Sequence, residues 1–369
     1  MKKLILPLTI IVILAATAVC GAQNAGLGTS IKRSSRQGAI RTPRWSPDGG
    51  KVAFVYDIAG NAEVYIADAD GTNVVLASNN KAVDINPVWS PDGKTLLFVS
   101  NRNGSQFDIC RVNSEGEDLE CLDNPGDDLW PAWSPDGATV AYCNYVKGYP
   151  QVYFMSPDGQ SRELFDDRRA CHPAFSADGK RIALSSDGDL LIFKLNNKKS
   201  KNITEPLIYG NMVDDTMPVW APRGSRLAFI GRYEAYSSEV YTIAADGKKV
   251  RRITDNLFED FLPCWHPKGK GVLYAAFVQG RQPEIFVSDP ETPEKTRLTE
   301  NHIVEMEPRY SPDGKKIMYI ARKRTQDELY IMNDDGTDQR PLLQEPLPTV
   351  DDIRKAAEIK RKQNQDKGL

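Results

Sequence analysis

The pentapeptide "WSPDG" occurs three times, at Trp45–Gly49, Trp89–Gly93 and Trp133–Gly137. Related phrases continue the series at intervals of 42 to 45 residues: "FSADG" from Phe175, "WAPRG" from Trp220, "WHPKG" from Trp265 and "YSPDG" from Tyr310. Proline fixes φ at the second position of a type I turn, aspartate suits the third, and glycine supplies the left-handed conformation that follows. Each phrase is therefore predicted to form the tip of a β-hairpin.

Each turn is followed by an apolar, β-rich run such as "KVAFVY", and then by another such as "EVYIAD". Most repeats add a second turn and a fourth short strand ending like "RRIT". Four strands in about 44 residues match one blade of a β-propeller, whose strands are apolar on both faces because each blade packs between two neighbours. The sequence predicts an all-β propeller of about seven four-stranded blades over residues 42–345. Six or eight blades remain open if a terminal unit is incomplete.

The segments outside this repeat have a different composition. Residues 1–22 place two lysines before an apolar run and end in small residues, which is typical of a cleaved signal peptide and of a periplasmic or secreted protein. A retained anchor and a lipoprotein acylated at Cys20 are the alternatives, although the apolar run is short for a membrane span. Residues 23–41 are predicted to be a flexible lead-in or a closing strand, and residues 346–369 a charged, helical tail.

The net charge of −3 and the isoelectric point of about 5.8 give no overall basic field for a nucleic acid, and leave only local patches open. Five cysteines remain after the predicted cleavage, so at least one is unpaired in an exported chain. Cys110 and Cys121 flank a predicted hairpin turn, where a local disulfide is one option. No cysteine has metal-ligand spacing, and we interpret all of them as structural.

The segments Pro87–Phe98, Glu239–Gly247 and Arg251–Thr254 resemble the TolB-type β-propeller repeat, and this resemblance covers nearly the whole mature chain. TolB itself is a periplasmic partner of the peptidoglycan-associated lipoprotein and of the Tol envelope machinery, and it carries an α/β domain before its propeller. Only about 20 residues separate the predicted cleavage site from the first blade here. The resemblance therefore implies the TolB propeller without the preceding domain.

Two related groups of enzymes share this repeat. Prolyl oligopeptidase-type enzymes join a similar propeller to a hydrolase domain, but the sequence contains no GxSxG motif. Oligogalacturonate lyase is a propeller alone and binds a divalent metal mainly through histidines. This chain has His172, His266 and His302, and the strand order places His266 at the opposite end of the ring from the other two. A non-catalytic protein without a cofactor is predicted, with the lyase as the alternative.

We define the top face as the end of the ring that carries the segment before each innermost strand and the loop joining the second and third strands. Five acids lie three positions before the proline of the repeat, at Asp84, Asp128, Asp215, Asp260 and Glu305. They could ring the channel mouth and hold a hydrated cation or a basic peptide. The alternative is that each carboxylate caps backbone N–H groups or pairs with an arginine between blades.

The top loops of the third and fifth blades differ from the rest of the repeat because they are rich in tyrosine. The candidate binding residues are Tyr145, Tyr149, Tyr233 and Tyr236, with Trp130 and Phe107 in neighbouring top segments. Exposed aromatic side chains on a rigid rim suit stacking on sugars or anchoring a peptide, whereas loops that pack on one another are the alternative. We expect a monomeric scaffold that binds an envelope protein or a cell-wall component.

Overall fold

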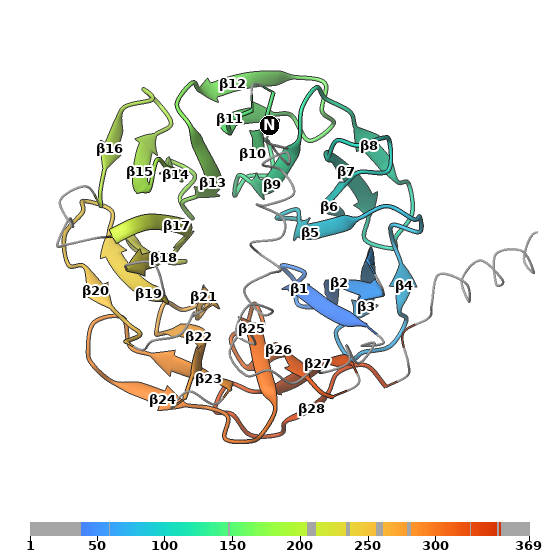
Figure 1. Cartoon of the computed structure of the whole chain (residues 1–369), viewed down its shortest axis with the longest axis vertical. Coiled ribbons are helices and arrows are strands. Elements are labelled where there is room, and N and C mark those ends of the chain that lie inside the picture. Colours follow the sequence, from blue (N-terminus) through green and yellow to red (C-terminus); the bar gives the residue numbers. More distant parts are fainter. Residues whose placement is uncertain are drawn as a thin grey trace, which may run out of the picture. The chain divides into compact units, whose positions relative to one another are not determined.

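The computed structural model describes residues 38–58, 60–146, 148–204, 212–233, 237–255, 261–278, 282–324, 326–344 and 347. These residues form seven four-stranded antiparallel sheets arranged as blades around a centre, with no helix among them (Figure 1). The predicted seven-bladed propeller is confirmed. The predicted signal peptide lies outside the described residues, as does the helical tail apart from Leu347. The described part contains no helix that could cross a bilayer.

Every blade consists of four consecutive strands. Blade 1 contains β1 (Ala39–Trp45), β2 (Lys51–Ile58), β3 (Asn61–Asp68) and β4 (Val75–Leu76), and blade 2 contains β5 (Asp84–Trp89), β6 (Thr95–Ser100), β7 (Asp108–Asn113) and β8 (Glu120–Leu122). Blade 3 contains β9 (Asp128–Trp133), β10 (Val140–Asn144), β11 (Gln151–Met155) and β12 (Arg162–Asp166), and blade 4 contains β13 (Ala170–Phe175), β14 (Arg181–Ser186), β15 (Asp189–Lys194) and β16 (Ser200–Asn202).

The other three blades follow the same order. Blade 5 contains β17 (Met212–Trp220), β18 (Arg226–Tyr233), β19 (Ser237–Ala244) and β20 (Arg251–Arg252). Blade 6 contains β21 (Phe261–Trp265), β22 (Val272–Phe277), β23 (Pro283–Ser288) and β24 (Lys295–Arg297), and blade 7 contains β25 (Val304–Tyr310), β26 (Lys316–Arg322), β27 (Asp327–Asn333) and β28 (Arg340–Pro341). In each blade the first strand is innermost (Figure 1).

The repeated phrase forms the hairpin turn between the first and second strands. In blade 1 the Ser46 hydroxyl donates to the Asp48 carboxylate at 2.5 Å and accepts the Lys51 N–H at 2.8 Å, while Gly49 has φ of +75°. The phrase "WHPKG" has histidine in place of this serine, and there His266 Nδ1 accepts the Lys268 N–H at 3.0 Å. The serine and aspartate of the phrase therefore satisfy the backbone of the turn.

The tryptophan of the phrase joins one blade to the preceding one. Trp220 Nε1 donates to the Ala174 carbonyl at 2.9 Å, and Trp265 Nε1 donates to the Val219 carbonyl at 3.0 Å. Trp133 is the exception, because its buried Nε1 has no partner among the described residues. The phrase thus specifies both the turn and a contact between blades.

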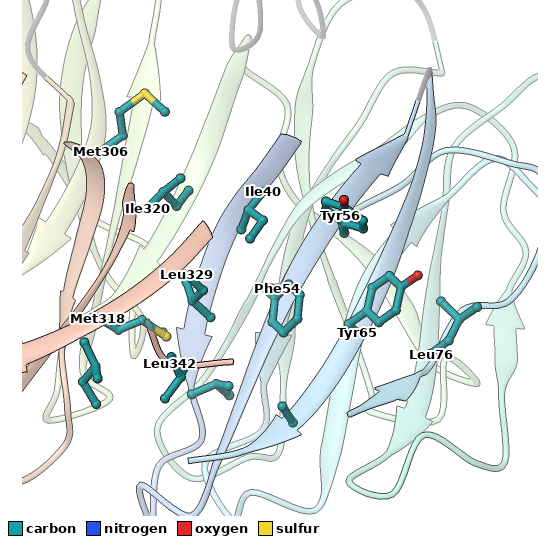
Figure 2. Close-up of a cluster of buried hydrophobic side chains, with 13 residues drawn as sticks. Ile40, Phe54, Tyr56, Tyr65, Leu76, Met306, Met318, Ile320, Leu329 and Leu342 are labelled. Atoms are coloured by element: carbon teal, nitrogen blue, oxygen red, sulfur yellow. The ribbon is translucent and has the colours of Figure 1, made fainter. Parts of the chain in front are cut away.

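The ring closes between blades 7 and 1 by packing, without exchange of a strand in the described part of the chain. Ile40 and Phe54 from blade 1 share a buried cluster with Met318 and Leu329 from blade 7 (Figure 2). The Asp327 N–H also donates to the Gly38 carbonyl at 3.2 Å. Residues 39–41, within the predicted lead-in or closing strand, begin the innermost strand of blade 1 itself.

Two disulfides link strands of the propeller. Cys110 pairs with Cys121 across β7 and β8, and Cys143 pairs with Cys171, which joins blade 3 to blade 4. Cys264 is a free thiol. The expected unpaired cysteine and the optional local disulfide are both confirmed.

Candidate functional site

The acids predicted at the channel mouth are buried where the structure describes their side chains. Asp84, Asp128 and Glu305 are each no more than 1% exposed. Asp84 and Asp128 begin the innermost strands β5 and β9, and Glu305 is the second residue of β25. The Asp215 side chain and all of Asp260 lie outside the described residues. The three described carboxyl groups therefore lie within the packed blades and not on an open rim.

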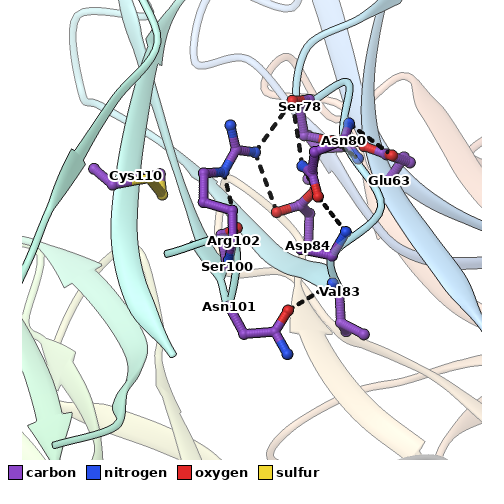
Figure 3. A network of polar contacts seen from close by, with 12 residues as sticks. Glu63, Ser78, Asn80, Val83, Asp84, Ser100, Asn101, Arg102 and Cys110 are labelled. Carbon is purple, nitrogen blue, oxygen red and sulfur yellow. Dashed lines mark hydrogen bonds and ion pairs between the residues drawn. A yellow bond between two sulfur atoms is a disulfide. The ribbon is translucent and has the colours of Figure 1, made fainter. Parts of the chain in front are cut away.

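Asp84 belongs to a polar network between blades 1 and 2 (Figure 3). Its carboxylate accepts hydrogen bonds from Arg102 Nη2 at 3.3 Å and from Asn80 Nδ2 at 2.5 Å, and Arg102 Nη2 also donates to the Ser78 carbonyl at 3.1 Å. Glu63 of blade 1 accepts the Ser78 hydroxyl and the Asn80 N–H. Burial, with the neighbouring Asp84 carboxyl, raises the pKa of Glu63 to about 7. The network connects the third strand of one blade to the first strand of the next.

Asp128 and Glu305 have similar surroundings at two other junctions. Asp128 Oδ1 accepts Asn144 Nδ2 at 2.6 Å and Asn124 Nδ2 at 3.3 Å, and burial raises the pKa of this carboxyl to about 7. Glu305 accepts Asn301 Nδ2 at 2.7 Å, and burial raises its pKa as well. The recurring acids thus act in contacts that recur with the blade. Among the described residues no three histidine, cysteine or acidic side chains converge as a metal site.

One described residue of the predicted aromatic surface is buried. Phe107 was expected on the exposed rim, but it is 7% exposed and its N–H donates to Asp127 Oδ1 at 2.9 Å. This prediction is wrong, because Phe107 precedes the first residue of β7 just as the buried Ala62 precedes Glu63 in blade 1. It fills a repeated core position.

The tyrosine loop of blade 3 is partly exposed. Tyr145 and Tyr149 are half-buried, and Val146 between them is 50% exposed. The Tyr145 N–H donates to the Asp127 carbonyl at 3.0 Å, and burial raises the pKa of the Tyr145 hydroxyl, with a smaller contribution from the Asp127 charge. The corresponding side chains of blade 5, Tyr233 and Tyr236, lie outside the described residues.

Trp130 lies on the innermost strand β9, where its ring packs in a T-shaped arrangement with the His172 ring of blade 4, with centroids 4.6 Å apart. His172 Nδ1 in turn contacts Thr216 Oγ1 of blade 5 at 3.0 Å. Burial lowers the pKa of His172 to about 4, so the imidazole is neutral near pH 7. A continuous line of side chains therefore runs across the inner strands of three blades.

Trp130 and His172 belong to a structural set that the sequence reasoning missed. Every innermost strand has a register shift at the same place, and in six of these strands the residue before the proline is in the left-handed region. The members are Thr42, Asn86, Trp130, His172, Met217 and Glu307, with φ between +47° and +54°. A bulge of this kind redirects a side chain. We call this set the bulge ring.

The signal for the bulge ring is present in the sequence as a variable residue before a proline that all seven repeats share. A residue before proline is normally extended, so a left-handed conformation is not expected from the pattern alone. The backbone bulge is repeated in each blade, whereas the residue type at this position differs from blade to blade. Different side chains can therefore occupy this position while the backbone of the blade stays the same. It is the part of the inner strands best suited to carry specificity.

Comparison with known proteins places the chain in a family. The sequence matches the TolB beta propeller domain over residues 23–128 and 127–347, and the chain belongs to this family. Among curated proteins no sequence matches.

Several solved structures share the fold at low sequence identity. The β-propeller domain of the Trilobed protease from Pyrococcus furiosus has a TM-score of 0.62 and 15% identity, with 84% of this chain and 96% of that one covered. A puromycin-hydrolyzing peptidase from Mycobacterium tuberculosis has a TM-score of 0.64 and 14% identity, with 85% and 54% covered. An oligogalacturonate lyase from Vibrio parahaemolyticus has a TM-score of 0.56 and 14% identity, with 83% and 86% covered.

Proposed function

We propose that this protein is an exported, non-catalytic propeller that binds an envelope protein or a cell-wall component through its top face. Membership of the TolB beta propeller domain family and the signal-peptide pattern of residues 1–22 support this proposal. Rigid scaffolds commonly carry their binding residues on loops of this kind.

The observation that carries the proposal is an exposed apolar side chain on a loop that is fixed to the framework. Val146 is one of three exposed large apolar side chains among the described residues. Its loop is held by the hydrogen bond from Tyr145 to Asp127, and the Gly126 α-carbon lies so close that an added Cβ would be 2.9 Å from the Val146 nitrogen. A fixed loop loses little conformational entropy when a partner covers it.

The inner strand next to this loop supplies aromatic surface. The segment Gly126–Asp127 leads directly into β9, which carries the half-buried Trp130. Tyrosine and tryptophan are the side chains that most often anchor protein interfaces and stack on sugars. The blade 3 sector therefore combines a fixed apolar tip with aromatic residues.

The test is a pull-down from an envelope extract of the source organism. We expect Y145A/V146D to lose a component that the wild type retains. The matched control is L164D, which introduces the same charge at a 40% exposed apolar position on the outer strand of the same blade. Retention of the same components by the wild type and Y145A/V146D would refute the top-face proposal.

The non-catalytic part is tested separately with purified protein and polygalacturonate in the presence of Mn²⁺. We expect no unsaturated product to accumulate. Time-dependent release of that product would establish the lyase alternative instead.

A further inference from the structure

A basic groove of about 820 Å³ lies between blades 4 and 5, on the end of the ring opposite the top face. It is bounded by the end of β15, by β16, and by the turns before β18 and after β19. Among the described residues that line it, Asp246 is the one acid. Its cationic lining consists of Arg181, Lys194, Lys199, Lys201, Arg226, Lys248 and Lys249. This concentration contrasts with the net charge of −3 of the whole chain.

Four of the seven basic residues, Lys199, Lys201, Lys248 and Lys249, come from the segments that join the third and fourth strands of blades 4 and 5 or, for Lys201, from the fourth strand itself. Blades 1 and 7 have "DADGTN" and "NDDGTD" between their third and fourth strands, whereas blade 4 has "NNKKSK" and blade 5 has "ADGKKV". The positive charge is therefore not a requirement of blade architecture. The lysine-containing segments of blades 4 and 5 lie side by side at this groove.

Four of the lysines are free to meet a ligand. Lys194, Lys199, Lys248 and Lys249 are exposed, and within the described residues none has a side-chain hydrogen bond or an ion pair. The two arginines are engaged differently. The Arg181 guanidinium lies 4.8 Å from the centre of the Trp220 ring, and Arg226 pairs with Glu291 at 3.1 Å.

Hydrogen bonds and close packing join the two sides of the groove, which belong to blades 4 and 5. Lys201 Nζ of blade 4 donates to the Asp246 carbonyl of blade 5 at 2.5 Å, and the Asp246 carboxylate accepts the Lys248 N–H at 3.0 Å. Gly247 approaches Ile203 so closely that an added Cβ would lie 3.1 Å from the Ile203 carbonyl oxygen. The turn that presents Lys248 and Lys249 is thus docked on the neighbouring blade.

The next junction provides a comparison within the same molecule. The groove between blades 5 and 6 has a volume of about 450 Å³, and its lining contains both signs of charge: Arg223, Arg226 and Lys270 with Asp289 and Glu291. There the charges compensate one another, as in the pair of Arg226 with Glu291. Of these two neighbouring junctions, only the one between blades 4 and 5 has a predominantly basic lining among the described residues.

We propose that this groove binds a flexible linear polyanion, a polymer that carries an anionic group on each of several successive units. Lysine ammonium groups act as point charges and do not impose the planar, two-point geometry of arginine. Free lysines spread along a groove suit a chain of phosphate or carboxylate groups better than one small anion. Clefts lined by one sign of charge also concentrate ligands of the opposite sign. This proposal is independent of the top-face binding site.

The experiment measures binding of long-chain inorganic polyphosphate and of alginate, a polyuronate, to the full chain by isothermal titration calorimetry. If the four free lysines neutralise four anionic groups of the bound polymer, the logarithm of the affinity falls with the logarithm of the salt concentration with a slope of about −0.7 per charge. This predicts a loss of affinity of roughly 50-fold between about 50 and 200 mM salt. K199Q/K248Q should reduce the affinity and lower this factor to roughly 7-fold. Tighter binding of polyphosphate identifies phosphate as the recognised group, and tighter binding of alginate identifies carboxylate.

The control K94Q/K315Q removes the same charge from the exposed hairpin turns of blades 2 and 7. It should keep the affinity and salt dependence of the wild type. Failure of both polymers to bind overturns the proposal. An equal loss in the control variant also overturns it, because binding would then depend on total charge and not on the groove.

Discussion

Asp128 offers a direct test of the interpretation that the recurring acids are structural. Its carboxyl is 1% exposed, Oδ1 accepts from Asn144 and Asn124, and Oδ2 has no hydrogen-bond partner among the described residues. Burial raises the pKa of this group from 3.8 to about 7. The folded protein therefore keeps a proton on Asp128 under conditions in which the unfolded chain has lost it.

The expected effect follows from the difference between the two pKa values. Below about pH 4 both states are protonated, and above about pH 7 both are ionised, so stability changes between these limits. Because the folded state binds the proton more tightly, the free energy of unfolding falls as the pH rises. The pKa difference of about 3 units corresponds to about 4 kcal/mol at 1.36 kcal/mol per unit.

Replacing Asp128 with asparagine removes this titration while keeping a similar shape. The difference in the free energy of unfolding, D128N minus wild type, should therefore rise by about 4 kcal/mol between pH 4 and pH 7.5. Urea unfolding followed by tryptophan fluorescence measures it at each pH, with the nearby Trp130 and Trp133 as reporters. A difference that stays constant with pH, or falls, would refute the reasoning.

Asp136, in the exposed hairpin turn of the same blade, is the control with the opposite sign. The Ser134 hydroxyl bond lowers the pKa of Asp136, so its contribution to stability is present above its unfolded pKa and is lost as the pH falls. The difference D136N minus wild type should therefore decrease as the pH rises through the acidic range. The free energies of unfolding of the two variants, each relative to the wild type, should therefore change with pH in opposite directions. This distinguishes a buried acid at a blade junction from an exposed acid in a turn.

Two matched pairs test the contacts between blades, each by urea unfolding at neutral pH. W220F should lower the free energy of unfolding by about 1–2 kcal/mol more than W133F, because Trp220 donates a hydrogen bond across a junction and the buried Trp133 Nε1 has no partner among the described residues. Equal losses would contradict this role of Trp220. G71A should lower the free energy of unfolding by at least about 2 kcal/mol, because a Cβ would overlap the Leu342 carbonyl where blades 1 and 7 meet. G224A has a similar φ of +80° but open space around it, and should lower the free energy of unfolding by about 1 kcal/mol. Equal losses for G224A and G71A would contradict the closure contact.

The blade count and the turns could be predicted because they depend on local chemistry. Proline, aspartate and glycine define the turn within five residues, and the alternation of turns and apolar runs defines the strands. The disulfide between Cys143 and Cys171 could not be predicted in the same way, since it depends on how strands of two blades face each other. Sequence spacing within one blade carries no information about that contact.

The acids three positions before the repeat proline were found from the sequence, but they allowed two interpretations, a cation site at the channel mouth or structural contacts between blades. Their recurrence at one repeat position was visible, but the sequence did not show whether the side chains face water or a neighbouring blade. The structure places Asp84 beside Arg102 and Asn80, in a network that reaches Glu63 of the preceding blade. Those partners lie 4 to 21 positions away from Asp84 in the sequence. Their convergence depends on blades packing in register.

The two proposed binding surfaces follow from one physical distinction. A side chain that repeats in register contributes to a contact that every blade needs, and changing it costs stability at a junction. A side chain that departs from the repeat and is exposed can change at little cost, as with Val146 on the top face and Lys199 and Lys248 in the basic groove. Phe107 supports the distinction, because it differs in size from Ala62 yet is buried at the same position. Departure from the repeat indicates a binding residue only when exposure accompanies it, and exposure is the property that the structure supplies.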